Sequence, residues 1–366
     1  MISTITDKTL VLSTAEADRW NHILTSFPVA LQDIHLTPAY HQLYEKNGDG
    51  EARLFVYSSK DNIYINSHLI RPVDAQWAGA GYFDIETPYG YGGPVSTTED
   101  KAFLLQATNA FSDYCKEQKI ISEFVRFHPL LRNYRFVPAG GRMKVIPLRD
   151  YLTVNLQQSK EELEMKYLPK NRTVLRKAEK EGVHVIEDKA TTQFDTFKNI
   201  YLSKMSELGA TSTYFFSEPY FRELRKLIQR HGRLLIAIGP QGVEGGAVFL
   251  YMGNWAHYFL AAVTNEGRKH GAGNLLLHEG INWARTQGAT LMHIGGGVTA
   301  DPKDPLLLFK QCFTSDQVPF HIGKSIHNEE VYREACDKWD RHFAPHAEKF
   351  SAILQRYHFK EKDLLG

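Results

Sequence analysis

The sequence predicts an α/β protein built from two similar units. The chain has 366 residues, which is a natural length for two domains. Short runs rich in β-branched and aromatic residues alternate with segments of helical periodicity along most of the chain. Residues 111–129 and 281–297 both run from a helix end through a short polar turn into a strand and an unusual loop. This faint internal repeat indicates two copies of one α/β unit.

The composition excludes several classes of protein. The chain has 43 Lys and Arg against 42 Asp and Glu, a net charge of +1, and 43% hydrophobic residues. These values argue against a disordered tail and against a domain that binds DNA or membranes by bulk charge. The three cysteines are far apart, so no disulfide framework or zinc knuckle is expected. His342 and His346 are four residues apart, but Pro345 interrupts the helix that would align them, so we expect no metal site.

The beginning of the sequence, MISTITDKTL, lacks a basic segment followed by an apolar one. No window approaches eighteen uninterrupted apolar residues, so we expect no transmembrane segment. A reducing cytoplasm is the expected location.

The first half of the chain reads as strands, a loop, a helix and a further strand. The strands are expected at 53–57 and 63–65, and a loop rich in glycine and tyrosine at 84–94. The helix is expected at 98–118, with Thr98 as its cap, and the strand at 120–127.

The second half contains four predicted helices and four predicted strands. The first helix, 169–181, has a proline at its first position and Gly182 just beyond its end. Six basic residues and one acid between Lys166 and Lys180 give this region a local charge of +5. The other helices are expected at 217–230, at 274–286 and from Glu329 onward, and the strands at 234–238, 247–251, 256–262 and 291–294.

The most specific motif is the segment Arg268-Lys-His270-Gly271-Ala272-Gly273-Asn274. It has the pattern R-x-x-G-x-G and lies between a predicted strand and a predicted amphipathic helix. Glycines let backbone N–H groups close around an anion, and a helix N-terminus adds a partial positive charge. The segment does not fit a dinucleotide fingerprint or a Walker P-loop. A pyrophosphate site is indicated, although a simple turn into a helix would also fit.

The motif matches the acyl-CoA pyrophosphate loop of the GCN5-related N-acetyltransferases (GNAT), Q/R-x-x-G-x-G/A. Other features follow in the order found in one branch of that superfamily: the Tyr-Gly-Tyr-Gly-Gly-Pro run, the FVRFHP strand, the basic helix, the Gly295–Gly297 loop and the Leu308-Phe309-Lys310 run. The chain therefore resembles the FemAB-like branch of the GNAT superfamily, over residues 50–325. The peptidoglycan-bridge aminoacyltransferases also belong to this branch.

The resemblance implies two tandem GNAT-like domains, each a mixed sheet flanked by helices, with a substrate cleft between them. We expect an N-terminal, acceptor-side domain at 1–150, a C-terminal domain with the donor loop at 151–327, and a helical segment at 328–366 that packs on the first domain. The second copy alone has the R-x-x-G-x-G loop, so one acyl donor site per chain is implied.

The resemblance leaves the acyl donor open. The loop is intact here, and no long heptad insertion appears, whereas members that use charged tRNA tend to have a degenerate loop and often a coiled-coil arm. Both points favour acyl-CoA as co-substrate, with acetyl-CoA the first candidate, over aminoacyl-tRNA.

Lys310 is the first candidate for catalysis. The resemblance places it at the cleft, where a cation would stabilise charge on the reacting carbonyl or hold an acceptor phosphate. A lysine with its head in solvent is the alternative. Arg172 and Arg176 share a helix face that would bind a nucleotide-linked or lipid-linked diphosphate, or would simply be solvated.

Amine acylation needs a base near the nucleophile. Candidates are Asp84 and Tyr91 in the first-half loop, Tyr258 on the strand before the donor loop, and Asp301 and Asp304 after the triple glycine. Tyr258 is equally suited to a core position.

Tyr89 and Tyr91 are also candidates for contacting the acceptor. The sequence thus predicts a bacterial N-acyltransferase that acts on a small-molecule amine, such as an amino sugar or another cell-envelope precursor. The alternatives are an aminoacyl-tRNA-dependent aminoacyltransferase and a non-catalytic binding protein. DNA is not an expected partner.

Overall fold

A computed structural model describes residues 8–364, which divide into two compact units. Unit 1 contains residues 8–31, 35–148 and 320–364, and unit 2 contains residues 32–34 and 149–319. None of the helices in the described range is long and apolar enough to cross a membrane.

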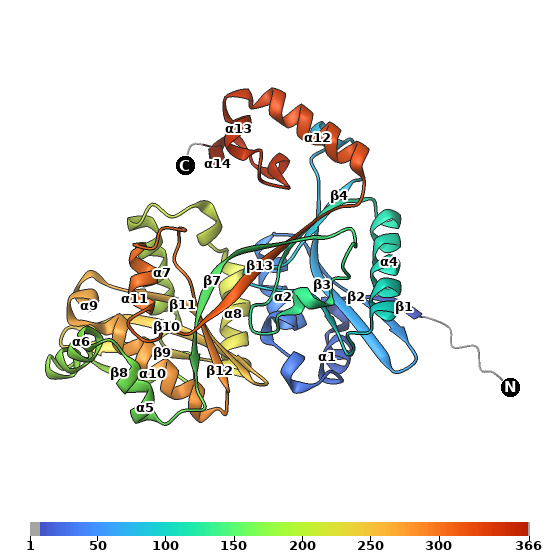
Figure 1. Ribbon diagram of the computed structural model, residues 1–366. Coiled ribbons are helices and arrows are strands. Elements are labelled where there is room, and N and C mark those ends of the chain that lie inside the picture. The colour runs from blue at the N-terminus through green and yellow to red at the C-terminus, as the bar shows by residue number, and fades with distance from the viewer. Residues whose placement is uncertain (1–7, 365–366) are drawn as a thin grey trace. The chain divides into compact units, whose positions relative to one another are not determined.

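Unit 1 has a mixed sheet in the order β1-β2-β3-β4-β6-β13, with β5 paired to β3 (Figure 1). Its neighbouring strands are antiparallel except for β4 and β6, which are parallel. The strands are β1 (Lys8–Ser13), β2 (Glu51–Ser59), β3 (Asn62–Pro72), β4 (Phe83–Glu86), β5 (Gly93–Ser96), β6 (Ile120–Arg126) and β13 (Gln317–Ile326). The α-helices are α1 (Ala17–Thr25), α2 (Pro38–Asn47), α3 (Ala75–Ala78), α4 (Lys101–Glu117), α12 (Glu329–His342), α13 (Ala347–Phe350) and α14 (Glu361–Leu364).

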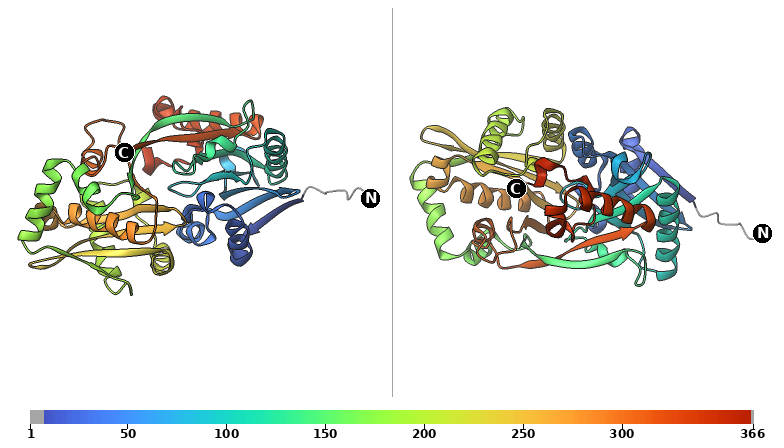
Figure 2. Two further views of the ribbon diagram at one scale, coloured as in Figure 1. Left: turned by 60° about the horizontal axis from the view of Figure 1, so that its bottom comes forward. Right: turned by 90° about the horizontal axis from the view of Figure 1, so that it is seen from above.

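The C-terminal segment packs within unit 1, where a cluster centred on Trp339 joins it to Trp77 of α3 and Ile121 of β6. The two views of Figure 2 show the red C-terminal helices beside the cyan elements of this unit. Buried hydrogen bonds also join this segment to the sheet: Tyr357 and His358 both bond to the carboxylate of Asp84 on β4.

Unit 2 has a mixed sheet in the order β7-β12-β11-β10-β9-β8, in which β11 and β12 are parallel. Helix α10 packs on β9, β10 and β11 and buries Leu276, Leu277 and Ile281 in the core. The strands are β7 (Lys144–Asn155), β8 (His184–Glu187), β9 (Gly232–Gly239), β10 (Gly242–Met252), β11 (Trp255–Val263) and β12 (Leu291–Gly295). The α-helices are α5 (Lys160–Lys166), α6 (Pro169–Lys180), α7 (Phe194–Glu207), α8 (Glu218–His231), α9 (Asn265–His270), α10 (Ala272–Thr286) and α11 (Pro305–Lys310).

Each unit has one parallel strand pair joined through a helix, β4–α4–β6 in unit 1 and β11–α10–β12 in unit 2. The segments 111–129 and 281–297 of the sequence repeat are the helix-to-strand halves of these two motifs. The expected α/β class with two GNAT-like sheets is therefore confirmed.

Two local predictions were wrong. The cap of α4 is Asp100, whose carboxylate accepts from the Phe103 amide, whereas the Thr98 hydroxyl accepts from the Asp100 amide in the preceding turn. The glycine-rich turn before α10 contains the short helix α9, which Thr264 caps. Strands β7 and β13, through which the chain passes from one unit to the other, were not predicted from the sequence.

Candidate functional site

The donor loop, residues Arg268–Asn274, joins α9 to α10 in unit 2. Gly271 ends α9 with φ of +82°, a conformation that a residue with a Cβ adopts only with strain. Arg268 and Lys269 are exposed, and His270 is partly exposed. The loop therefore combines an exposed basic pair with the beginning of a fifteen-residue helix, which is a suitable setting for a phosphate group.

The two glycines of the donor loop have different surroundings. A β-carbon at Gly271 would lie 2.6 Å from Cγ1 of Val174 on α6, so this glycine allows the helix and the loop to pack closely. A β-carbon at Gly273 would meet only Val263, at 3.8 Å, which is ordinary contact. Asn274 donates to the side chain of Asn171 on α6 at 2.8 Å and fixes the loop on that helix.

Strands β11 and β12 are paired in parallel only over their N-terminal residues. This pairing joins Trp255, Ala256 and His257 to Leu291, Met292 and His293, while β11 continues to Val263, close to the donor loop. Phe259 is an extra residue of β11 opposite β10, because Tyr258 pairs with Phe249 and Leu260 with Val248. Beyond His257, the edge of β11 that faces β12 has no further pairing with β12, so an extended ligand could form hydrogen bonds to the backbone there.

His270 of the donor loop has a buried carboxylate partner. Its Nδ1 lies 2.7 Å from Oε1 of Glu244, a residue on β10 that is only 4% exposed. The backbone oxygen of Glu244 also accepts from the amide of Thr264, the cap of α9. Glu244 therefore holds both ends of α9, and His270 has a structural partner as well as a place in the loop.

Lys310, at the end of α11, is 7% exposed and points into unit 2. Its Nζ donates to the backbone oxygen of Gly296 at 2.8 Å and would lie 2.9 Å from a β-carbon on Gly295. Burial lowers the pKa of Lys310 from 10.5 to about 8, against the opposing charge of Asp304. The glycine turn, residues Gly295–Gly297, is thus shaped around a lysine ammonium.

Asp304 and Asp301 serve the loop around the glycine turn. Burial would raise the pKa of Asp304, but hydrogen bonds from Thr299, Leu306 and Leu307 outweigh it and hold the pKa at about 2. Asp301 is exposed, and its Oδ1 accepts from the amide of Lys303. A carboxylate held this strongly in its charged form, as Asp304 is, is a weak base.

Tyr258 lies on β11, as expected, and packs against the core of unit 2. Its ring stacks on Phe249 with centroids 5.4 Å apart. Burial raises the pKa of Tyr258, so its phenol is a poor base at neutral pH.

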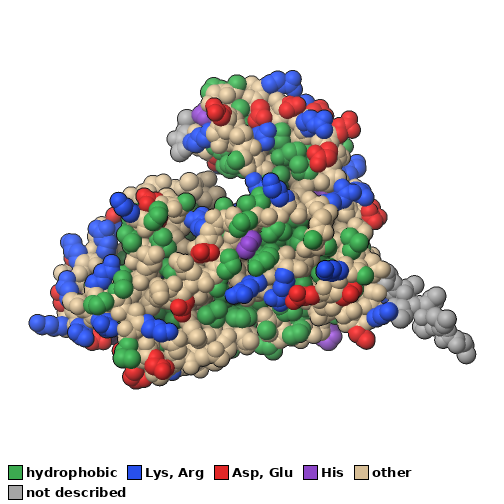
Figure 3. All heavy atoms as spheres, viewed as in Figure 1, with side chains coloured by type: hydrophobic (Ala, Val, Ile, Leu, Met, Phe, Trp, Pro, Cys, Tyr) green, Lys and Arg blue, Asp and Glu red, His purple; other side chains and the backbone are tan. Residues whose placement is uncertain are grey.

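The basic helix α6 lies against α9 and α10. Figure 3 shows Lys and Arg side chains gathered over the α6 and α9 end of unit 2. Arg176 is exposed, whereas Arg172 is partly buried and donates to the carbonyl oxygen of Met165 at the end of α5. Arg172 therefore has a structural contact, and the open part of this surface includes Arg176, Lys180 and the exposed residues of the donor loop.

The remaining candidates lie in unit 1. Asp84 is completely buried, and besides Tyr357 and His358 it accepts from the amide and hydroxyl of Ser122. These contacts are those of a structural carboxylate that joins the C-terminal segment to the sheet. Tyr89 is exposed, and its carbonyl oxygen accepts from Tyr40.

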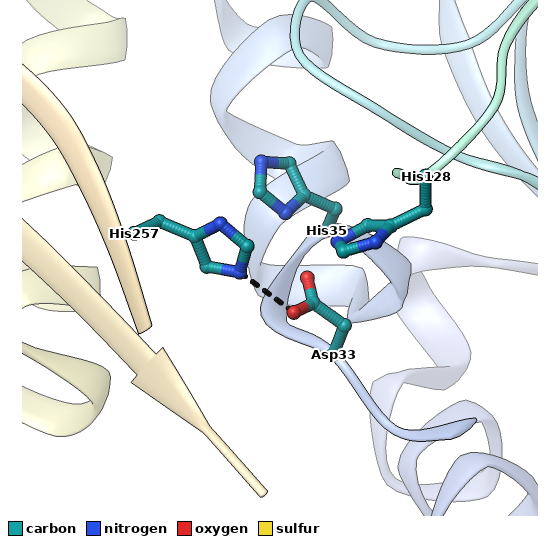
Figure 4. A group of neighbouring side chains, drawn as sticks. All are labelled: Asp33, His35, His128 and His257. Atoms are coloured by element: carbon teal, nitrogen blue, oxygen red, sulfur yellow. Dashed lines mark hydrogen bonds and ion pairs between the residues drawn. The ribbon is translucent and has the colours of Figure 1, made fainter. Parts of the chain in front are cut away.

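Tyr91 contacts two histidines of unit 1 that the sequence analysis did not select. Its ring meets His35 and His128 edge-on, with centroids 5.2 and 5.5 Å away, and these two histidines lie 5.3 Å from each other (Figure 4).

Unit 2 also holds a histidine pair with a carboxylate that was missed. Nε2 of His257 lies 2.7 Å from Oδ2 of Asp33, as the dashed line in Figure 4 marks, and Asp33 is completely buried. His257 pairs with His293 on β12, and their ring centroids are 6.0 Å apart. Taken separately, neither unit brings three His, Cys, Asp or Glu side chains of the described range together around one point where a metal ion could bind.

Comparisons with known proteins agree with this geometry. The family model described as "Acetyltransferase (GNAT) domain" matches residues 169–302, which include β11, the donor loop, α10 and β12. No curated protein sequence is similar enough to the chain to count as a match.

Three solved structures have similar folds at low sequence identity. FemX has a TM-score of 0.66 at 14% identity, and the alignment covers 89% of this chain and 99% of FemX. The C-terminal domain of an Agrobacterium fabrum protein described as a lysylphosphatidylglycerol synthetase has a TM-score of 0.53 at 13% identity, with 90% and 96% covered. A Bacteroides thetaiotaomicron protein of unknown function has a TM-score of 0.54 at 11% identity, with 88% and 100% covered.

The family match confirms the resemblance to the GNAT superfamily over residues 169–302 and supports an acyltransferase, and the similarity of fold to FemX is consistent with the FemAB-like branch. Residues 169–302 match the model of a GNAT acetyltransferase domain, within a chain whose fold is similar to that of FemX.

Proposed function

We propose that the protein is an N-acyltransferase that moves an acyl group from acyl-CoA to an amine. The observation that carries this proposal is the position of the donor loop, which follows the end of β11 that lies beyond the β11–β12 pairing. A CoA pyrophosphate bound at Arg268 and the N-terminus of α10 would direct its pantetheine arm along β11. Val263 is six residue steps along the strand from His257, which is roughly 20 Å and suits an extended pantetheine arm.

The reaction follows from groups near the paired end of β11 and β12. The amine nitrogen attacks the thioester carbon, and the backbone N–H groups of β11 near Phe259 stabilise the oxyanion. The Lys310 ammonium adds positive charge at the glycine turn that follows β12. The carbon–sulfur bond then breaks, and the CoA thiolate leaves with the electron pair.

The acceptor is proposed by chemistry and by analogy of fold. Arg176 and Lys180 on α6 are exposed cations beside the donor loop, and they suit a phosphate or diphosphate group. An amino sugar carried by a nucleotide or lipid diphosphate has both the amine and the anion. The similarity to FemX supports this choice only at the level of the fold.

Thermal unfolding with and without acetyl-CoA tests the donor site. Ligand at about 100 times its Kd stabilises the protein by roughly 2.7 kcal/mol, which gives a clear shift in Tm. In Gly273→Glu, a carboxylate enters the loop at a position without a close neighbour, so the protein should fold and lose the shift. Gln287→Glu adds the same charge at the exposed opposite end of α10 and should keep it. If acetyl-, succinyl- and longer acyl-CoAs give no shift in the unmodified protein, the acyl-CoA proposal is wrong.

A second candidate is an aminoacyltransferase that takes its group from charged tRNA. It is favoured by the extent of the similarity to FemX, which covers 89% of the chain, and by the basic surface of α6. Binding of aminoacyl-tRNA that weakens steeply with salt and is lost in Arg176→Glu would support it. Binding of acetyl-CoA without binding of tRNA would exclude it.

A further inference from the structure

Two histidines oppose each other at the last paired position of β11 and β12. His257 and His293 are register partners in this parallel pair, and they are 2% and 4% exposed. Paired residues of neighbouring strands project from the same face of a sheet, and here the ring centroids are 6.0 Å apart. We refer to these two residues as the histidine rung.

The histidine rung lies at the end of β11 that is remote from the donor loop. A donor bound with its pyrophosphate at the loop would therefore present its acyl end near the rung. This part of the argument rests on the proposed function.

Asp33 fixes the orientation of the first histidine. Its Oδ2 lies 2.7 Å from Nε2 of His257, and both side chains are buried, with 0% and 3% exposed. A carboxylate that accepts from one ring nitrogen fixes the imidazole tautomer and leaves the other nitrogen as an acceptor. The carboxylate of Asp33 also lies one ring away from His293.

His293 lies beside the glycine turn and Lys310. A β-carbon on Gly295 would lie 3.9 Å from Cε1 of His293 and 2.9 Å from Nζ of Lys310, so both groups surround the same backbone position. The ring of Tyr151 meets His293 edge-on with centroids 5.3 Å apart. An imidazole and an ammonium thus converge where β12 ends.

The other base candidates are less suitable. Asp84 is engaged in four hydrogen bonds inside unit 1, and Asp304 in four within its own loop. Tyr258 is a buried phenol, and Lys310 donates to the Gly296 oxygen. An imidazole is the side chain whose basicity suits proton removal near neutral pH.

We propose that His293 is the general base for the acceptor amine and that Asp33 and His257 are its positioning residues. A ring nitrogen of His293 takes one proton from the acceptor ammonium, and the neutral amine nitrogen then forms its new bond to the thioester carbon. The carbon–sulfur bond breaks and the thiolate takes the electron pair; it then takes the second proton that the nitrogen loses, and the imidazolium releases the first proton to solvent. Asp33 keeps its negative charge throughout and stabilises the imidazolium across the ring of His257.

The test uses two small acceptors of similar size with acetyl-CoA, and it follows the release of CoA thiol. Methylamine is protonated at neutral pH and needs a base, whereas hydroxylamine is already neutral. In His293→Gln, the second-order rate constant for methylamine should fall about 100-fold or more. The rate constant for hydroxylamine should fall at least tenfold less than that for methylamine, because no proton has to be removed before attack.

Supporting variants separate proton transfer from structure. Asp33→Asn should shift the ratio of the two rate constants in the same direction by a smaller factor. Added imidazole should restore part of the methylamine rate in His293→Ala. His278→Gln changes another buried histidine of unit 2, which bonds to Tyr167 and Asn282 on the α10 side, and should leave the ratio unchanged.

The results also distinguish this inference from the proposed function. If the unmodified protein shows no thermal shift with acetyl-CoA, the proposed function fails, and the base assignment fails with it. If acetyl-CoA binds equally well to His293→Gln and the two acceptors lose rate by the same factor, the base assignment alone is overturned. The same holds if the unmodified protein binds acetyl-CoA and acylates neither acceptor.

Discussion

Replacement of Lys310 by methionine should stabilise the protein while it abolishes acyl transfer. Burial lowers the pKa of this lysine from 10.5 to about 8, and one pKa unit corresponds to about 1.4 kcal/mol. The buried ammonium therefore costs about 3 kcal/mol relative to a neutral side chain in the same place. Methionine has a similar volume and loses the hydrogen bond to Gly296, which is worth about 1 kcal/mol. The net gain in the free energy of unfolding should be about 2 kcal/mol at pH 6.5.

The effect of this substitution should depend on pH with a defined sign. Below pH 8 the lysine is protonated in both the folded and the unfolded state, so the full cost is present. Between pH 8 and 10.5 the folded state releases its proton first, and the stability of the unmodified protein rises. The advantage of Lys310→Met should therefore shrink over this range and vanish at about pH 10, and near pH 10.5 the variant should be less stable by about 1 kcal/mol, because only the lost hydrogen bond remains.

Urea denaturation at pH 6.5, 8 and 10 measures these differences, because groups common to both proteins cancel. Lys303→Met, an exposed lysine of the loop between the glycine turn and α11, is the control and should change stability by no more than about 0.5 kcal/mol. If Lys310→Met is less stable than the unmodified protein by 1 kcal/mol or more at pH 6.5, the ammonium is a stabilising group and the reasoning is refuted.

Three further predictions concern the donor loop, acid stability and the C-terminal segment. Gly271→Ala should lower the free energy of unfolding by about 1–3 kcal/mol, because Gly271 has a positive φ and lies close to α6. Gly273→Ala should lower it by less than about 1 kcal/mol. Chemical denaturation of both variants measures the difference. Burial lowers the pKa of His68 to about 3, so between pH 6.5 and 3 this residue should lower the free energy of unfolding by up to about 1.4 kcal/mol per pH unit. The Tm of His68→Gln should therefore depend less on pH over this range, and an equally steep dependence would contradict the prediction. Asp84→Asn should lower the free energy of unfolding by about 3 kcal/mol, because the buried carboxylate accepts a hydrogen bond from Tyr357. The C-terminal segment should then be cleaved faster in limited proteolysis. Unchanged cleavage would show that the hydrophobic cluster alone holds this segment on the sheet.

Local signals were enough to predict much of unit 2. The donor loop and the helix after it follow from glycine spacing and helical periodicity, which depend on neighbouring residues only. For Lys310 the sequence left two positions open, at the cleft by resemblance or with its head in solvent. Helix α6 was predicted at almost its observed limits because a proline and a glycine mark its ends. The short helix α9 was missed because its sequence carries the polar and glycine residues of a turn.

Long-range pairings were not predictable from one sequence. His257 and His293 become partners through the register of two parallel strands separated by α9 and α10, and Asp33 lies more than 200 positions away from both. No local period encodes such a register. Strands β7 and β13 were missed for a local reason. Each has a proline near its start, Pro147 in β7 and Pro319 in β13, so the pattern for a strand is weak.

In unit 1, the segment that follows β4 occupies the place that the donor would take in unit 2, which explains why a single donor site is expected. In unit 2 the chain leaves β11 through the donor loop, and the β11–β12 pairing stops at the histidine rung. In unit 1 the chain leaves β4 and returns as Gly92–Ser96, where β5 pairs with β3 and Gly92 bridges Phe127 just beyond β6.

The backbone of unit 1 is therefore satisfied where a donor would lie in unit 2. Asn133 fixes this segment by donating to the carbonyl oxygens of Gly92 and Pro94, and a β-carbon on Gly93 would lie 2.5 Å from Val125. A ligand could replace these contacts only by removing β5 from the sheet, which costs several hydrogen bonds of about 1 kcal/mol each. Calorimetric titration should accordingly give one acetyl-CoA per chain, lost entirely in Gly273→Glu. Two sites, or one that survives this substitution, would show that the segment around β5 opens and that unit 1 also binds the donor.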